Sequence, residues 1–163
     1  MTYQISGLSP RLAEPFEGID DAQLTTLGAV RMVATSKPGF PCRISLADAE
    51  VGEEIILFHH VSHDVDSPYR SAYAIFIRTG LTEAAHYIDE IPPVFQDRNL
   101  AMRAFGKDAM LKTAMLSLSG NADKSIRELF ELDEVAYIDV HNAAYGCLPR
   151  EWRDSKHDTR TCR

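Results

Sequence analysis

The stretch NLAMRAFGKDAMLKTAMLSL (99–118) decides the class of fold. It holds two runs of strand length, NLAMRAF (99–105) and LKTAMLSL (111–118), separated only by GKDAM (106–110). A parallel connection between neighbouring strands needs a dozen or more residues, so a connection this short joins antiparallel strands. The stretch therefore predicts an antiparallel sheet.

Other strand-like runs are spread along the chain, and most of their connections are also short. They are AVRMVAT (29–35), CRISL (42–46), EEIILFHHV (53–61), YAIFIR (73–78) and VAYIDVH (135–141). Each is rich in β-branched or aromatic residues and is bounded by turn residues. Long crossover helices have no room between them, which favours a largely antiparallel sheet.

Helix signals are few. Asp20 and Gln23 have the spacing of a capping box for a helix over 21–27, and Gly28 supplies a left-handed stop. A second helix is predicted over 123–132, with Asn121 as its N-cap. We therefore predict an α+β fold with two or three short helices and a core made by a single pair of layers.

Composition points to one domain and excludes several functions. The 163 residues suit a single domain over 1–153, followed by a polar C-terminal tail over 154–163. The net charge of −7 argues against nucleic acid and anionic membrane surfaces as partners, because both attract basic proteins. No run approaches the roughly 20 apolar residues of a membrane span, and the N-terminus lacks a secretory-signal pattern.

Cysteine usage indicates the compartment. The three cysteines, Cys42, Cys147 and Cys162, are odd in number and widely spaced, unlike a disulfide framework. We therefore expect a cytoplasmic protein.

Polar residues alternate with apolar ones along several predicted strands. In VAYIDVH, Tyr137, Asp139 and His141 share one face, whereas Ile138 and Val140 point to the core. This pattern has two readings: a solvated sheet face, or a polar pocket on the sheet.

Arginines are the candidate anion ligands. Arg43, Arg70, Arg78 and Arg103 lie in or beside predicted strands of this acidic chain. A pair of guanidinium groups that converge would bind a carboxylate or a phosphate. Internal salt bridges with Asp48, Asp139 or Glu53 are the alternative use of these side chains.

Two residues are candidates for catalysis. Cys42 precedes Arg43, whose charge favours a thiolate, and His141 with Asn142 would complete the residue types of a thiol-hydrolase triad. A buried cysteine that acts as a small hydrophobe, and a His141 that bonds a turn carbonyl, are the structural alternatives.

The segment HHVSH (59–63) holds three histidines, and a helical turn there would bring pairs of them together. Zinc needs three or four ligands on a firm scaffold, so we predict no metal and no other cofactor. Signatures such as GxxxxGK[ST], GxGxxG, HExxH and GxSxG do not occur.

A family resemblance covers most of the chain. The segments 28–57, 67–78, 99–105 and 137–147 resemble the bacterial family called domain of unknown function 1203, over about Gly7 to Cys147. PCR (41–43), SPYR (67–70) and HNAAYGC (141–147) are its most specific parts. The resemblance implies a stand-alone cytoplasmic domain and no particular reaction.

Two functions remain open. The first is a small-molecule binding protein or enzyme, with a pocket where the PCR, SPYR and HNA segments converge. Its catalytic residues would be Cys42 and His141, and its ligand-binding residues would be Arg43, Tyr69, Arg70 and Asn142. The second is a non-catalytic module that forms a homodimer through an apolar face or an edge strand.

Overall fold

The computed structural model describes residues 2–146 and 151–154. Its helices are η1 (Pro10–Leu12), η2 (Glu14–Phe16), α1 (Asp21–Thr26), α2 (Pro93–Gln96) and α3 (Ala122–Phe130). Its strands are β1 (Tyr3–Ser6), β2 (Ala29–Val33), β3 (Glu54–His63), β4 (Ser71–Ile77), β5 (His86–Ile88), β6 (Leu100–Phe105), β7 (Leu111–Ser117), β8 (Tyr137–Asn142) and β9 (Glu151–Asp154).

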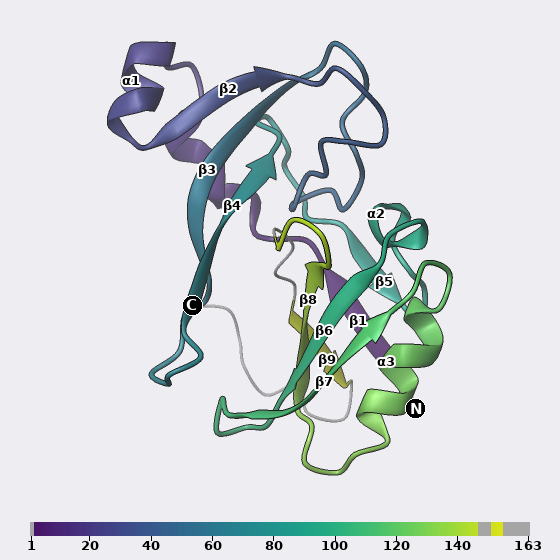
Figure 1. Ribbon diagram of the computed structural model, residues 1–163. Helices are drawn as coiled ribbons and strands as arrows, with labels where there is room; N and C mark the ends of the chain where they lie inside the picture. The colour runs from purple at the N-terminus through teal and green to yellow at the C-terminus, as the bar shows by residue number, and fades with distance from the viewer. Residues whose placement is uncertain (1, 147–150, 155–163) are drawn as a thin grey trace.

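The strands form two sheets, and all the pairings between the described strands are antiparallel. One sheet has six strands in the order β5-β1-β9-β8-β6-β7, and the other has three in the order β2-β3-β4. Figure 1 shows the three-stranded sheet with α1 at one end of the molecule and the six-stranded sheet with α3 at the other. Short helices and antiparallel strands confirm the predicted α+β class.

Apolar side chains gather in two clusters, one for each sheet. Ile126, Leu129 and Phe130 of α3 pack with Met102 and Ile138 of the six-stranded sheet, while a second cluster joins the three-stranded sheet to the N-terminal helices. The sequence predicted one core between a single pair of layers. The chain instead builds two cores because the β2–β3–β4 meander packs on its own helical segment.

The structure confirms both of the predicted helices. Asp20 and Gln23 form both hydrogen bonds of the capping box, and Gly28 has φ +68°. The helix predicted over 123–132 is α3, although Asn121 makes no side-chain cap there. Five of the predicted strands correspond to β2, β3, β4, β6 and β8, and 111–118 corresponds to β7.

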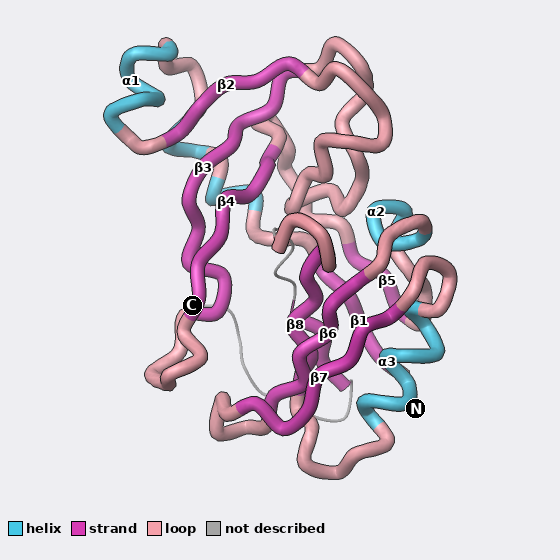
Figure 2. The backbone as a smooth tube through the Cα atoms, viewed as in Figure 1, coloured by secondary structure: helices cyan, strands magenta, loops and turns pink. Residues whose placement is uncertain are grey.

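The prediction of a strand at CRISL (42–46) is wrong. Only Cys42 makes a bridge there, to Phe76, and the chain then turns. The backbone N–H of Leu46 donates to the carbonyl of Cys42 at 3.1 Å, and Leu46 has a positive φ of 51°. The segment belongs to a long loop between β2 and β3, which is prominent in Figure 2. The alternation expected around Arg43 therefore does not apply.

Of the two readings of VAYIDVH, the solvated face is not observed at Asp139 and His141. Ile138 and Val140 face the core as expected, but Asp139 and His141 on the other face are buried too. Tyr73 of β4 covers that face, with its ring centroid 4.9 Å from the His141 imidazole. Strand β8 is thus covered on both sides where the two sheets meet.

The described residues bear only in part on two further expectations, the polar C-terminal tail and the lack of a membrane span. Of the predicted tail 154–163, only Asp154, the last residue of β9, is among the described residues. Within the described chain, none of the helices has the length and apolar character needed to span a bilayer.

Candidate functional site

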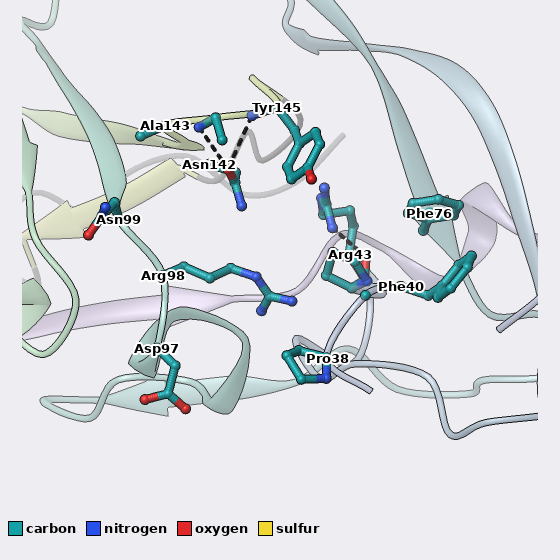
Figure 3. Close-up of a pocket in the computed structure, with 13 residues that line it drawn as sticks. Pro38, Phe40, Arg43, Phe76, Asp97, Arg98, Asn99, Asn142, Ala143 and Tyr145 are labelled. Atoms are coloured by element: carbon teal, nitrogen blue, oxygen red, sulfur yellow. Dashed lines mark hydrogen bonds between the residues drawn. The ribbon is translucent and has the colours of Figure 1, made fainter. Parts of the chain in front are cut away.

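A cavity of about 890 Å³ lies where three parts of the chain meet. Its walls come from the β2–β3 loop (38–41 and 43), the approach to β6 (97–99) and the end of β8 with the turn after it (142–145). Phe76 of β4 completes the lining. Figure 3 shows these side chains around the opening. The two sheets thus both contribute to one pocket.

The β2–β3 loop is held firmly although it is not a strand. Pro38 and Pro41 lack a backbone N–H and keep the segment out of a sheet. The N–H of Arg43 donates to the Phe76 carbonyl at 2.9 Å, and the N–H of Gly39 donates to Asp48 Oδ1 at 3.0 Å. The position of Arg43 is therefore fixed by β4.

Arg43 is buried, with 2% of its surface exposed. Its Nη1 donates to the carbonyl of Pro41. The guanidinium points toward the hydroxyl of Tyr145 (Figure 3). A charged group buried beside a cavity can bind an anion without first giving up much hydration.

Asn142 ends β8 and has a fixed side-chain orientation. Its Oδ1 accepts the backbone N–H groups of Ala144 at 2.9 Å and Tyr145 at 3.1 Å. This Asx-type turn leaves the Nδ2 amide nitrogen, with its two N–H donors, on the side away from the turn. Figure 3 shows Nδ2 pointing into the space between Asn142 and Arg98.

Arg98 is oriented by a buried carboxylate. Its Nη2 lies 2.8 and 3.0 Å from the two carboxylate oxygens of Asp48, and its Nη1 donates to the Val94 carbonyl. Burial alone would raise the pKa of Asp48. The hydrogen bonds from Arg98 and the Gly39 N–H, with the charges of Arg98 and Arg43, instead hold that pKa below its ordinary value. Asp48 is therefore ionised and holds Arg98 in place.

The remaining walls are mostly apolar. The rings of Phe40 and Phe76 pack with centroids 5.4 Å apart at 57°, and Pro38 is a further apolar residue of the lining. Asp97 is the acidic lining residue, but its carboxylate points away from Arg98 and Asn142 (Figure 3). The polar side chains that face the opening are thus mainly donors, which suits a ligand rich in acceptors.

The sequence grouped six residues in one site, and two of them line the pocket. Arg43 and Asn142 line the same pocket. Tyr69 and Arg70 lie in the turn between β3 and β4 and are not part of its wall. Arg70 pairs with Asp64 at 2.8 Å on the surface, and the Tyr69 ring packs against Phe105.

Cys42 is fully buried in the core of the three-stranded sheet. Its Sγ accepts the backbone N–H of Arg78 at 3.3 Å. Arg78 itself bonds Glu53 at 2.9 Å, which is the internal salt bridge considered from the sequence. The thiol is thus out of reach of a ligand in the pocket, and its surroundings are those of a small core residue.

His141 neighbours the pocket without lining it. Its Nδ1 lies 3.2 Å from the Gly146 carbonyl, which only accepts, so the neutral ring carries its proton on Nδ1. Nε2 is buried, has no hydrogen-bond partner among the residues that the structure describes, and lies 4.0 Å from Asp139 Oδ2. Burial first, and then the charges of Arg103, His63 and Arg43, lower the pKa of His141 to about 4. His141 is therefore neutral at pH 7.

The histidine-rich segment is extended. His59, His60 and His63 all lie in β3, so the helical turn that would pair them does not form. His63 instead bonds the Tyr137 hydroxyl at 2.7 Å and the Tyr69 carbonyl at 3.0 Å. Over residues 2–146 and 151–154, no group of three or more His, Cys, Asp or Glu is arranged to hold a metal ion.

Arg98 was missed by the sequence analysis. It stands just before β6, whereas Asn142 ends β8, and the antiparallel register pairs Leu100 with Asn142. The start of one strand therefore lies beside the end of the other. The arginine next to a predicted strand was visible in the sequence, but the pairing of two strands so distant in the chain was not.

Comparison with known proteins gives a family and no activity. Residues 39–152 match the model of the family described as "Protein of unknown function (DUF1203)". No curated protein and no solved structure matches this chain significantly. The matched region contains Arg43, Arg98 and Asn142, together with both phenylalanines of the pocket wall. The chain belongs to the DUF1203 family.

Proposed function

We propose that this protein binds a small anionic molecule in the pocket lined by Arg43, Arg98 and Asn142. One observation carries the proposal: the Oδ1 of Asn142 is occupied by two backbone N–H groups. Its Nδ2 therefore faces the same space as two guanidinium groups (Figure 3). Donors that converge on a cavity of this size are the usual form of an anion-binding site.

The proposal concerns binding. The two residues suggested as catalytic from the sequence, Cys42 and His141, are both buried outside the pocket wall. The function therefore rests on Arg43, Arg98 and Asn142, and we assign no bond-breaking step to the pocket.

A thermal-shift screen tests this function with a matched pair of variants. Asn142→Asp keeps the acceptor that the turn needs, but replaces the Nδ2 donor with a negative charge. Asn121→Asp makes the same chemical change at an exposed position outside the pocket. A ligand at 100 times its dissociation constant stabilises the folded state by about 2.7 kcal/mol.

Small anions should raise the melting temperature of the wild type and of Asn121→Asp, and they should not raise that of Asn142→Asp. The neutral amides of the same acids should have little effect on any of the three proteins. Equal shifts for both variants would place the binding elsewhere and contradict the proposal.

A second candidate is a non-catalytic homodimer joined through an edge strand. Strand β2 is an edge of the three-stranded sheet, and Val30 and Val33 on it are more than half exposed. Apolar edge strands tend to pair with another chain. Analytical ultracentrifugation should then show a dimer that Val30→Lys converts to a monomer. If the wild type were monomeric at about 100 µM, far above the roughly 1 µM dissociation constant of a typical dimer, the homodimer would be excluded.

We further propose that the protein acts in the cytoplasm and does not bind nucleic acid. Cys42 is a buried free thiol, which is compatible with a reducing compartment. The net charge of −7 would repel a polyanion, although a small anion inside a local cluster of donors is still attracted.

A further inference from the structure

We infer that the anion is a carboxylate carried on a flat apolar ring system. This inference rests on the proposed function and narrows it to one chemical class. It is carried by the kind of donors that line the pocket and by the apolar wall beside Arg43.

The donors of the pocket are planar side chains. Asn142 offers an amide NH₂, and Arg98 offers a guanidinium whose plane is fixed by Asp48 and the Val94 carbonyl. A carboxylate is also planar, and its two oxygens accept hydrogen bonds lying in one plane. The shape of these groups therefore matches a carboxylate.

Five backbone N–H groups of the pocket wall are already engaged within the protein. Phosphate sites commonly use several backbone N–H groups at a helix N-terminus or in a nest. Here the N–H of Gly39 donates to Asp48, and that of Arg43 donates to Phe76. The N–H groups of Ala143, Ala144 and Tyr145 are also engaged, by Asn99 and Asn142. These amides are therefore not available to cradle a tetrahedral anion.

The apolar wall beside Arg43 determines what kind of group can carry the carboxylate. The tilted rings of Phe40 and Phe76 form an apolar surface next to Arg43 (Figure 3), and Pro38 adds a further apolar residue to the lining. An aromatic ring packs favourably against such a surface and removes apolar area from water. At about 890 Å³ the cavity is wide enough for a ring system larger than benzene.

Isothermal titration calorimetry with naphthalene-2-carboxylate tests the inference on the whole chain. The comparison probes are naphthalene-2-carboxamide, which lacks the charge, acetate, which lacks the ring, and inorganic phosphate. Naphthalene-2-carboxylate should bind at least about 10-fold more tightly than each of them, because a charged hydrogen bond or a buried ring is worth that factor or more. Asn142→Asp should bind naphthalene-2-carboxylate no more tightly than naphthalene-2-carboxamide. Asn121→Asp should keep the wild-type preference for the carboxylate.

The outcomes separate this inference from the proposed function. If phosphate binds as tightly as the naphthoate and Asn142→Asp abolishes both, the pocket binds anions but the ligand class is wrong. If acetate equals the naphthoate, the ring wall has no role and the inference fails. If none of the anions binds at concentrations up to about 10 mM, where even weak affinities are measurable, the inference and the proposed function both fail.

Discussion

Asp48 reaches across the pocket loop to Arg98, and both of its carboxylate oxygens lie within 3.0 Å of the same guanidinium nitrogen. Both side chains are largely buried, with 10% and 15% of their surfaces exposed. The same carboxylate accepts the N–H of Gly39. One acidic residue thus joins the loop that bears Arg43 to the segment that bears Arg98, which sets the spacing between the two arginines.

Removal of the charge at residue 48 should destabilise the fold. Asp48→Asn can still accept from Gly39, but it leaves the Arg98 guanidinium without its carboxylate in a largely buried position. We expect a loss of about 2–4 kcal/mol in the free energy of unfolding, measured by urea denaturation. The control is Glu50→Gln, which removes an exposed ion pair with Lys37 in the same loop. That change should cost under about 0.5 kcal/mol, and equal costs would show that Asp48 does not hold the pocket together.

His141 should make stability depend on pH. Its folded-state pKa of about 4 lies below the ordinary 6.5, so the unfolded chain binds more protons between these values. Stability is therefore full above about pH 6.5 and falls as the pH drops toward 4, by at most about 3 kcal/mol. Urea denaturation at a series of pH values measures this slope.

His141→Asn is the matched variant for that slope. Its amide nitrogen can still donate to the Gly146 carbonyl, but the side chain does not titrate in this range. The variant should show a flatter stability curve between pH 6.5 and 4 than the wild type. Parallel curves would mean that His141 titrates in the folded protein as it does in the unfolded chain, and would contradict this prediction.

Gly7 should be intolerant of any side chain. A Cβ at this position would lie 1.8 Å from the backbone oxygen of Ile44, in the turn that follows Arg43. The loop would have to move, so Gly7→Ala should cost more than about 3 kcal/mol. Gly28→Ala is the comparison, because a Cβ there meets nothing within 4 Å and only the positive φ of 68° is strained. It should cost about 1 kcal/mol by thermal or urea denaturation, and a similar cost at Gly7 would contradict the close approach.

Local signals explain how much of the fold the sequence predicted. The first helix has its cap, its capping-box partner and its terminating glycine within nine residues, from Asp20 to Gly28, so each could be recognised without tertiary information. Strand β1 has only four residues, too few to display alternation, and pairs with residues eighty or more positions away, such as Gln4 with Ile88. It was missed for that reason.

The site was less predictable because tertiary contacts build it. The composition of CRISL suits a strand, but hydrogen bonds from the turn and from β4 decide its conformation. Arg43 and Asn142 were recognised as candidate ligand residues, whereas Arg98 depends on the pairing of β6 with β8. Tyr69 and Arg70 were grouped with them because SPYR is distinctive as a motif, and motif distinctiveness says nothing about distance in the fold.

The most direct test of anion binding is an NMR titration that follows the side-chain amide of Asn142, assigned by its loss in Asn142→Asp. Naphthalene-2-carboxylate should shift this pair of NH₂ signals progressively to saturation, and naphthalene-2-carboxamide should leave them nearly unchanged. If the Asn142 signals stayed in place while other resonances of the protein saturated, or if neither naphthalene-2-carboxylate nor inorganic phosphate moved any resonance, the pocket would not be an anion-binding site.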